Sequence, residues 1–213
     1  GLYNVVGGIV ILLNVVNTAM LATTYRYLAF EIGKKLGGNP NKIFNTSLLI
    51  HAVFAIGLIT VGIAVGDWYI CNYLNIVPDK ISDAIFVFHI SIITAALSTL
   101  FVPFQGLQVA YEKFTVNAAI DIISQSIKLA AIILLIYSDT NRLRLYSMIM
   151  LSYTFFSCVL YVGYCVMHYW NVIKPTVYKD SKLIKEMLQY ALWTMFGALA
   201  SVGKSQGSAV IIN

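Results

Sequence analysis

Residues 42–66 read KIFNTSLLIHAVFAIGLITVGIAVG, and their one charged side chain, Lys42, stands at the first position. A bilayer core about 30 Å thick needs roughly 20 consecutive, mostly apolar residues per helix. This stretch is therefore long enough for one membrane-spanning helix, and comparable stretches follow one another along the chain. We predict an all-α, polytopic transmembrane bundle with helices at about 3–27, 42–66, 82–110, 114–137, 143–170 and 184–213.

The composition fits that prediction. The 213 residues are 59% hydrophobic and 11% charged, far from the balance of a soluble globular domain. The net charge of +5 does not indicate nucleic-acid binding, because the basic residues lie between apolar stretches, where they set membrane orientation. Cys71, Cys158 and Cys165 form no C-x-x-C pair and have no histidine at ligand spacing. We therefore expect no metal and no cofactor.

The charged connections predict an orientation. Lysines gather in the first connection (Lys34, Lys35) and the fifth (Lys174, Lys179), whereas the second and fourth hold fewer. Odd connections are therefore expected in the cytoplasm, and Gly1 on the outer side. Since both ends of the chain are apolar, we expect a fragment of a longer multi-pass protein of the bacterial inner membrane, with one helix missing upstream.

Two connections carry local signals of their own. Gly37, Gly38, Asn39 and Pro40 form a strong helix-breaking cluster between the first two helices. Residues 67–80 hold several aromatic side chains and Pro78, which indicates a membrane-surface segment followed by a turn. Within the third helix, Pro103 is expected to kink the helix or to mark its end.

Polar residues follow one face of the predicted fourth helix: Asn117, Asp121, Ser124, Gln125 and Lys128. Charged groups at membrane depth cost a few kcal/mol unless they meet water or partners, so this face should point into the bundle or a polar cavity. Inward cations such as Lys128 and Lys204 suit an anionic solute. Lys128 could instead be neutralised by Asp121 through Gln125, since about 10.5 Å separates the two charged residues along the axis.

Other helices carry weaker polar faces, which include Asn14, Asn17 and Thr24 on the first and Ser91, Thr94 and Ser98 on the third. They predict either a shared polar cavity or hydrogen bonds between helices, and we favour hydrogen bonds for the uncharged residues. His51 and His89 are isolated in apolar helices, and we interpret them as hydrogen-bonded interior residues rather than proton carriers.

Two short motifs are expected to be coincidental. Residues 203–207 (GKSQG) match the G-x-S-x-G pattern of a hydrolase nucleophile, but they lie in an apolar helical segment rather than a strand–turn–helix. Residues 45–47 form a glycosylation sequon that the charge bias places on the cytoplasmic side. No nucleotide-binding or metalloprotease motif is present in the sequence, and we expect no enzyme.

Several segments together resemble bacterial polysaccharide and O-antigen (Wzx-type) flippases, in order and over nearly the whole chain. The similar segments are GLYNVVGG (1–8), TTYRYLAFEIG (23–33), IFNTS (43–47) through His51, VPFQ (102–105) with YEK (111–113), and 193–197 with 203–207. Two departures bear on substrate choice: Tyr25 stands where relatives often have Gln, and Lys204 stands where an uncharged residue is common.

The resemblance implies a partial MATE-like fold of the multidrug/oligosaccharidyl-lipid/polysaccharide (MOP) exporter superfamily. Residues 1–183 would supply helices of the first lobe, and residues 184–213 the start of the second. The implied function is flipping of undecaprenyl-pyrophosphate-linked oligosaccharide for polysaccharide or O-antigen synthesis. Implied partners are that substrate, membrane lipids, H⁺ or Na⁺ for coupling, and the polymerase or ligase machinery. The cationic cavity of such proteins would correspond here to Arg26, Lys128 and Lys204.

Substrate-binding candidates are therefore Arg26, Lys128, Lys204, Asp121, Gln125, Asn14 and Asn17. Two alternatives stay open. A MATE-type antiporter for cationic drugs would use a cavity carboxylate, for which Asp121 is the candidate. A scaffold without transport activity would organise a polysaccharide assembly complex and needs no charged faces inside the membrane.

Overall fold

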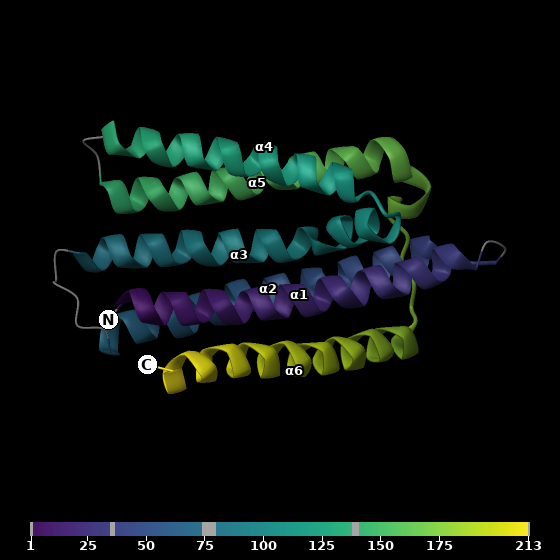
Figure 1. The fold of residues 1–213 in the computed structure, drawn as a ribbon, viewed down its shortest axis with the longest axis horizontal. Coiled ribbons are helices and arrows are strands. Elements are labelled where there is room, and N and C mark those ends of the chain that lie inside the picture. Colours follow the sequence, from purple (N-terminus) through teal and green to yellow (C-terminus); the bar gives the residue numbers. More distant parts are fainter. Residues whose placement is uncertain (1, 35–36, 74–79, 138–140, 213) are drawn as a thin grey trace.

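The computed structural model describes the backbone of residues 2–34, 37–73, 80–137 and 141–212, and side chains within these ranges from 15 to 201. The described chain forms six long α-helices and one short 3₁₀ turn (Figure 1). Their bounds are α1 Leu2–Gly33, α2 Pro40–Tyr73, α3 Ile81–Ala110, α4 Phe114–Leu134, η2 Leu135–Tyr137, α5 Arg142–Ile173 and α6 Ser181–Ile212. The predicted all-α bundle is confirmed.

Successive helices run antiparallel along one long axis, and α3 lies in the middle (Figure 1). It packs against α1 and α2 on one side and against α5 on the other, where α4 lies alongside α5. The last helix, α6, covers α1 on the edge of the bundle opposite α4. Residues from α1, α2 and α6 therefore approach one another although they are far apart in the sequence.

Polar side chains define several helix starts. Asn141 accepts hydrogen bonds from the backbone N–H groups of Leu143 and Arg144 and so caps α5. Before α2, the side chain of Asn39 accepts from the N–H of Lys42, and Pro40 occupies the first helical position. The breaker cluster is confirmed as a turn in which Gly37 adopts a φ of +88°, a value that favours glycine because it has no Cβ.

Two sequence-based helix ends are wrong. Helix α1 continues to Gly33 instead of ending near residue 27. Helix α2 continues to Tyr73 instead of ending near residue 66, so Asp67 to Tyr73 are helical rather than part of a connection. The Oδ1 atom of Asp67 lies 2.8 Å from Nε2 of His89 on α3, and this hydrogen bond ties the extension to the bundle. A helix end predicted from local hydropathy misses these polar helical residues, because the residue that contacts them lies on another helix. Pro103 lies inside α3, which continues to Ala110, so it does not mark the end of the helix.

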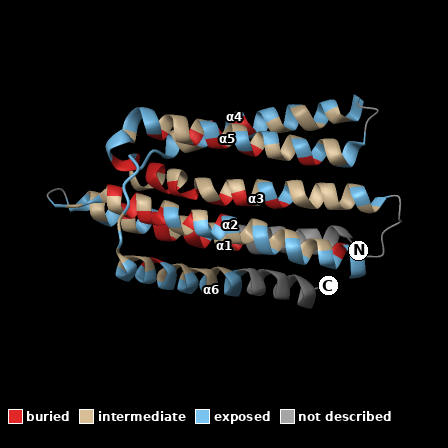
Figure 2. Cartoon of the chain, turned by 180° about the vertical axis from the view of Figure 1, so that it is seen from behind, coloured by how far each residue is buried: buried red, intermediate tan, exposed pale blue. Residues whose placement is uncertain are grey.

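Buried side chains gather toward the end where α1 leads into α2 (Figure 2). The cluster there comprises Leu28, Ile43, Phe44, Leu107, Cys165, Val172, Ile173 and Met187. By length and composition, four described helices could each cross a membrane: α2, α3, α4 extended by η2, and α5. Many large apolar side chains on these helices are exposed, among them Val61 at 63% and Ile122 at 66%. The chain is thus built as a membrane protein, whose exposed apolar side chains face lipid.

Candidate functional site: unpaired cations and an apolar cavity

The polar face of α4 points at α5, where tyrosines meet it. Tyr161 donates a hydrogen bond of 2.9 Å to Oδ1 of Asp121, and Gln125 donates one of 3.0 Å to the hydroxyl of Tyr153. Lys128 places its Nζ 4.8 Å from the centre of the Tyr153 ring. The residues that the helical period grouped therefore share partners on one neighbouring helix.

The route predicted from Lys128 to Asp121 through Gln125 is not the one observed. Tyr153 is the contact that Lys128 and Gln125 share, and Asp121 turns to Tyr161 instead. Because the ring face carries negative potential, it stabilises the ammonium without neutralising its charge. Lys128 forms no ion pair among the described residues.

Arg26 is held in the same way at the opposite edge of the bundle. Its guanidinium carbon lies 4.1 Å from the centre of the Tyr190 ring on α6, and Tyr190 also meets Tyr27 edge to face at 6.2 Å. The side chain of Arg26 is exposed and has no carboxylate partner within the described part of the chain. Two basic side chains of membrane-length helices are thus oriented by aromatic rings and keep their charge available.

Some other charged residues are paired with each other. Ion pairs among the described residues join Lys34 to Glu31, Lys42 to Asp180 and Arg144 to Asp83, and the ring of His89 contacts the carboxylate of Asp67. Outside the helices, the hydrogen bond from the Lys42 ammonium holds the pKa of the Asp180 carboxyl below its usual range, assisted by the backbone N–H of Leu183. The Lys42 and Arg144 pairs join different elements, and the Lys34 pair lies at the end of α1, so these charges already serve the structure.

Of the remaining substrate-binding candidates, Asn17 has a packing role, whereas Asn14 and Lys204 have side chains that the structure does not describe. Asn17 accepts a 2.9 Å hydrogen bond from Thr99, which joins α1 to α3. The side chains of Asn14 and Lys204, and residues 203–207, lie outside the described side chains. On α3, Ser91, Thr94 and Ser98 bond to carbonyl oxygens of their own helix instead of forming the expected bonds between helices. A hydroxyl three or four residues after a carbonyl reaches it without a partner helix.

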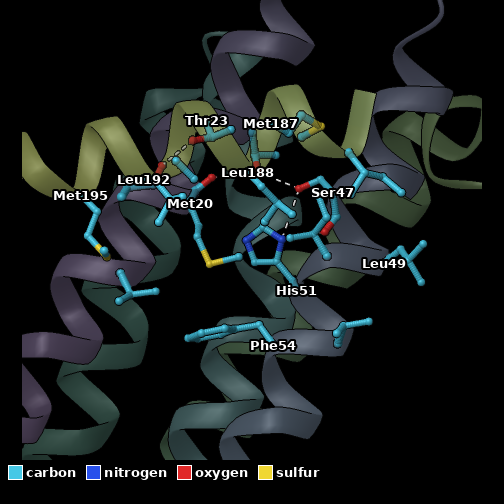
Figure 3. Close-up of a pocket in the computed structure, with 17 residues that line it drawn as sticks. Met20, Thr23, Ser47, Leu49, His51, Phe54, Met187, Leu188, Leu192 and Met195 are labelled. Carbon is cyan, nitrogen blue, oxygen red and sulfur yellow. Dashed lines mark hydrogen bonds between the residues drawn. The ribbon is translucent and has the colours of Figure 1, made fainter. Parts of the chain in front are cut away.

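An apolar cavity that the sequence did not predict lies between α1, α2 and α6 (Figure 3). It encloses about 480 Å³, and its lining comes from residues 16–24, 47–54 and 184–195. Buried Ala19 and Thr24 of α1 lie at its base, while Val53 and Leu192 stand at the exposed edges of α2 and α6. The described cavity therefore opens on the lateral surface of the bundle rather than into its centre.

The polar side chains on the cavity wall are turned away from it. Thr23 donates to the carbonyl of Ala19, and Thr24 shares a 2.7 Å hydrogen bond with Ser47. His51, on the same wall in Figure 3, places Nδ1 2.7 Å from the carbonyl oxygen of Ser47. Since that oxygen only accepts, Nδ1 carries the proton of this hydrogen bond.

His51 is thus an interior residue, as predicted, but only half of its hydrogen-bonding capacity is used. Its side chain is 2% exposed, and Nε2 has no partner among the described residues. His89 also has a partner, although that partner is the carboxylate of Asp67 rather than a backbone group. A cavity with such walls offers almost no hydrogen bond to water and suits an apolar occupant.

Comparisons with known proteins do not assign the site. No protein-family model matches the sequence, and neither a curated protein nor a solved structure matches the chain.

Proposed function

We propose that this protein is a membrane transporter that flips a lipid-linked oligosaccharide with an anionic headgroup between the leaflets of the bacterial inner membrane. The observation that supports the proposal is that Arg26 and Lys128 contact tyrosine rings but no carboxylate among the described residues. Both belong to membrane-length helices, both lie over tyrosine rings, and both lack an ion-pair partner among the described residues. A cation at membrane depth, as expected for Lys128, costs several kcal/mol, which a functional anion would offset.

The contacts also indicate how these groups would act. A guanidinium or ammonium stacked on a ring has restricted rotamers and still presents its N–H donors to one side. Phosphate oxygens accept charge-assisted hydrogen bonds from such donors, which are about twice as strong as neutral ones. Flipping requires no bond to be made or broken. It requires groups that replace the hydration of the headgroup while access alternates between the two sides.

The resemblance to Wzx-type flippases supports the same function and adds the expected substrate, an undecaprenyl-pyrophosphate-linked oligosaccharide for surface polysaccharide. The polar contacts disfavour the antiporter alternative, because the Asp121 carboxylate already accepts a hydrogen bond from Tyr161. A drug-binding cavity needs a carboxylate whose charge is not compensated in this way.

The proposal is tested by complementation. A strain without the gene for this chain receives the native gene, Lys128→Leu, Lys128→Arg or Lys113→Leu, and surface polysaccharide is measured at matched protein levels. Lys113 is an exposed residue in the connection before α4 and serves as the control. We expect at least a tenfold loss with Lys128→Leu, partial export with Lys128→Arg and normal export with Lys113→Leu. Normal export with Lys128→Leu would remove Lys128 from the site.

A further inference from the structure

The shape and the lining of the cavity between α1, α2 and α6 indicate where the lipid part of the substrate binds. Its lining extends along α6 from Ile184 to Met195, a rise of about 16 Å, and along α1 from Val16 to Thr24, about 12 Å. Its length thus runs parallel to the helices, which Figure 1 shows lying along one axis. An extended chain lying along the membrane normal fits such a space better than a compact molecule.

The side chains around this space suit hydrocarbon. Met20, Met187 and Met195 line it together with Leu, Ile, Val and Ala side chains. Thioether side chains are flexible and polarisable, so they adapt to an apolar occupant of irregular shape. Because Thr23, Thr24 and Ser47 satisfy their hydroxyls within the protein, they offer no competing site for water.

One basic group stands at the rim of the cavity. Arg26 follows Thr23 by three residues and so lies one turn farther along the same face of α1. Its ring partner, Tyr190, directly precedes the lining residue Ala191 on α6. Arg26 therefore lies just beyond the α1 part of the lining, on the side nearest the α1–α2 connection, which the charge pattern assigns to the cytoplasm. Its ring partner lies beside the middle of the α6 part of the lining.

The other charges at this rim leave it basic. Glu186 lies one turn before Tyr190 on α6 and forms no ion pair with Arg26 in the described structure. Lys182 and Lys185 share the first turns of α6 with it, and Glu31 and Asp180 are already paired with lysines. An anionic headgroup would therefore meet a net positive charge, although Glu186 opposes it.

We propose that this cavity binds the hydrocarbon chain of a single-chain lipid phosphate, with Arg26 at the rim holding the phosphate. The inference rests on the proposed function, because it names the place where the lipid part of that substrate lies. A single elongated cavity beside a single unpaired arginine fits one chain and one phosphate, whereas a bilayer phospholipid brings two chains. The lateral opening between Val53 of α2 and Leu192 of α6 lets the chain enter from the bilayer.

The test is photolabelling of the native protein in nanodiscs with a polyprenyl phosphate that carries a diazirine in its chain. We expect labelled peptides from 16–24, 47–54 and 184–195. Unlabelled polyprenyl phosphate should suppress this labelling at a concentration about tenfold lower than the uncharged polyprenol requires, because Arg26 contributes a charge-assisted hydrogen bond. A two-chain phosphatidylglycerol should compete no better than the polyprenol.

Variants locate the site more closely. Ala191→Phe places a ring in the cavity and should abolish the labelling. Ala200→Phe, nine residues later, points to the opposite side of α6 and is exposed, so it is the matched control. Arg26→Gln should remove the advantage of the phosphate over the polyprenol, Arg26→Lys should restore part of it, and Glu186→Gln should increase it.

The outcomes separate this inference from the proposed function. Labelling outside the three segments, equal competition by phosphatidylglycerol, or unchanged labelling in a well-folded Ala191→Phe variant would each overturn the inference. If Ala191→Phe does not fold, the competition series on the native protein still decides. If the cavity is labelled but the protein flips no lipid, the inference stands and the proposed function is refuted. If the protein flips lipid but the cavity is not labelled, the proposed function stands and the inference is refuted.

Discussion

Gly106→Ala is expected to force α1 and α3 apart at the base of the cavity. Gly106 is buried on α3, and a Cβ atom added there would lie 2.9 Å from Cγ2 and 3.2 Å from Cβ of Thr24 on α1. Thr24 cannot rotate away, because its hydroxyl bonds to the carbonyl of Met20 and to Ser47, and its Cβ is fixed to the helix backbone. The helices must therefore separate by a few tenths of an ångström.

The expected magnitude follows from two opposing effects. Overpacking of a tight contact costs about 1–3 kcal/mol, whereas replacing a helical glycine by alanine contributes roughly 1 kcal/mol of stability. The matched control is Gly163→Ala on α5, where an added Cβ would meet nothing within 4 Å and only the favourable effect remains. The two variants should thus differ in free energy of unfolding by about 1–3 kcal/mol.

The assay is the melting temperature of the purified native protein and both variants in the same detergent. For a chain of this size, about 1 kcal/mol corresponds to roughly 2–4 °C. Gly163→Ala should melt slightly above the native protein, and Gly106→Ala about 2–12 °C below Gly163→Ala. Equal melting temperatures for the two variants would refute the close approach of α1 and α3 on which the shape of the cavity depends.

Three further predictions concern polar contacts. Asn41→Ala removes two hydrogen bonds to backbone carbonyls at the end of α5 and beyond it, so it should lower stability by about 1–3 kcal/mol; an unchanged melting temperature would contradict this. The depressed pKa of the Asp180 carboxyl implies stability that is present above pH about 4 and is lost as the pH falls through the lower, folded-state pKa. The melting difference between the native protein and Asp180→Asn should therefore shrink on acidification, and a constant difference would exclude the Lys42 pair as its source. Tyr161→Phe leaves Asp121 without its hydroxyl donor and should reduce polysaccharide export, measured at matched protein levels; full export would show that orienting Asp121 is unnecessary.

Much of the architecture follows from local sequence. All six helices lie where runs of apolar residues predicted them, because the length of such a run and the thickness of a bilayer are directly related. The helix ends are less predictable. Helix α2 extends to Tyr73, and Asp67 in this extension is hydrogen-bonded to His89 of α3. A partner 22 residues away does not affect local hydropathy.

The candidate site was only partly predictable for the same reason. Lys128 can be recognised in the sequence as a cation within an apolar stretch, and Arg26 as one at the end of another, but their ring partners Tyr153 and Tyr190 come from other helices. The cavity was missed altogether, because apolar residues that line it are indistinguishable in sequence from those that face lipid. The methionines at positions 20, 187 and 195 were the one available signal, and it becomes informative only when α1 and α6 are brought together.

The most direct test of the central claim is the location of the lipid-linked oligosaccharide precursor in cells without this protein. In a strain that lacks the gene and any redundant exporter, the leaflet of the precursor is determined by its accessibility to an impermeant glycosidase or lectin added to spheroplasts. The proposed function predicts that the precursor accumulates on the cytoplasmic leaflet and returns to the outer leaflet when the native gene is restored. Precursor on the outer leaflet at the native level in the deletion strain would contradict the account.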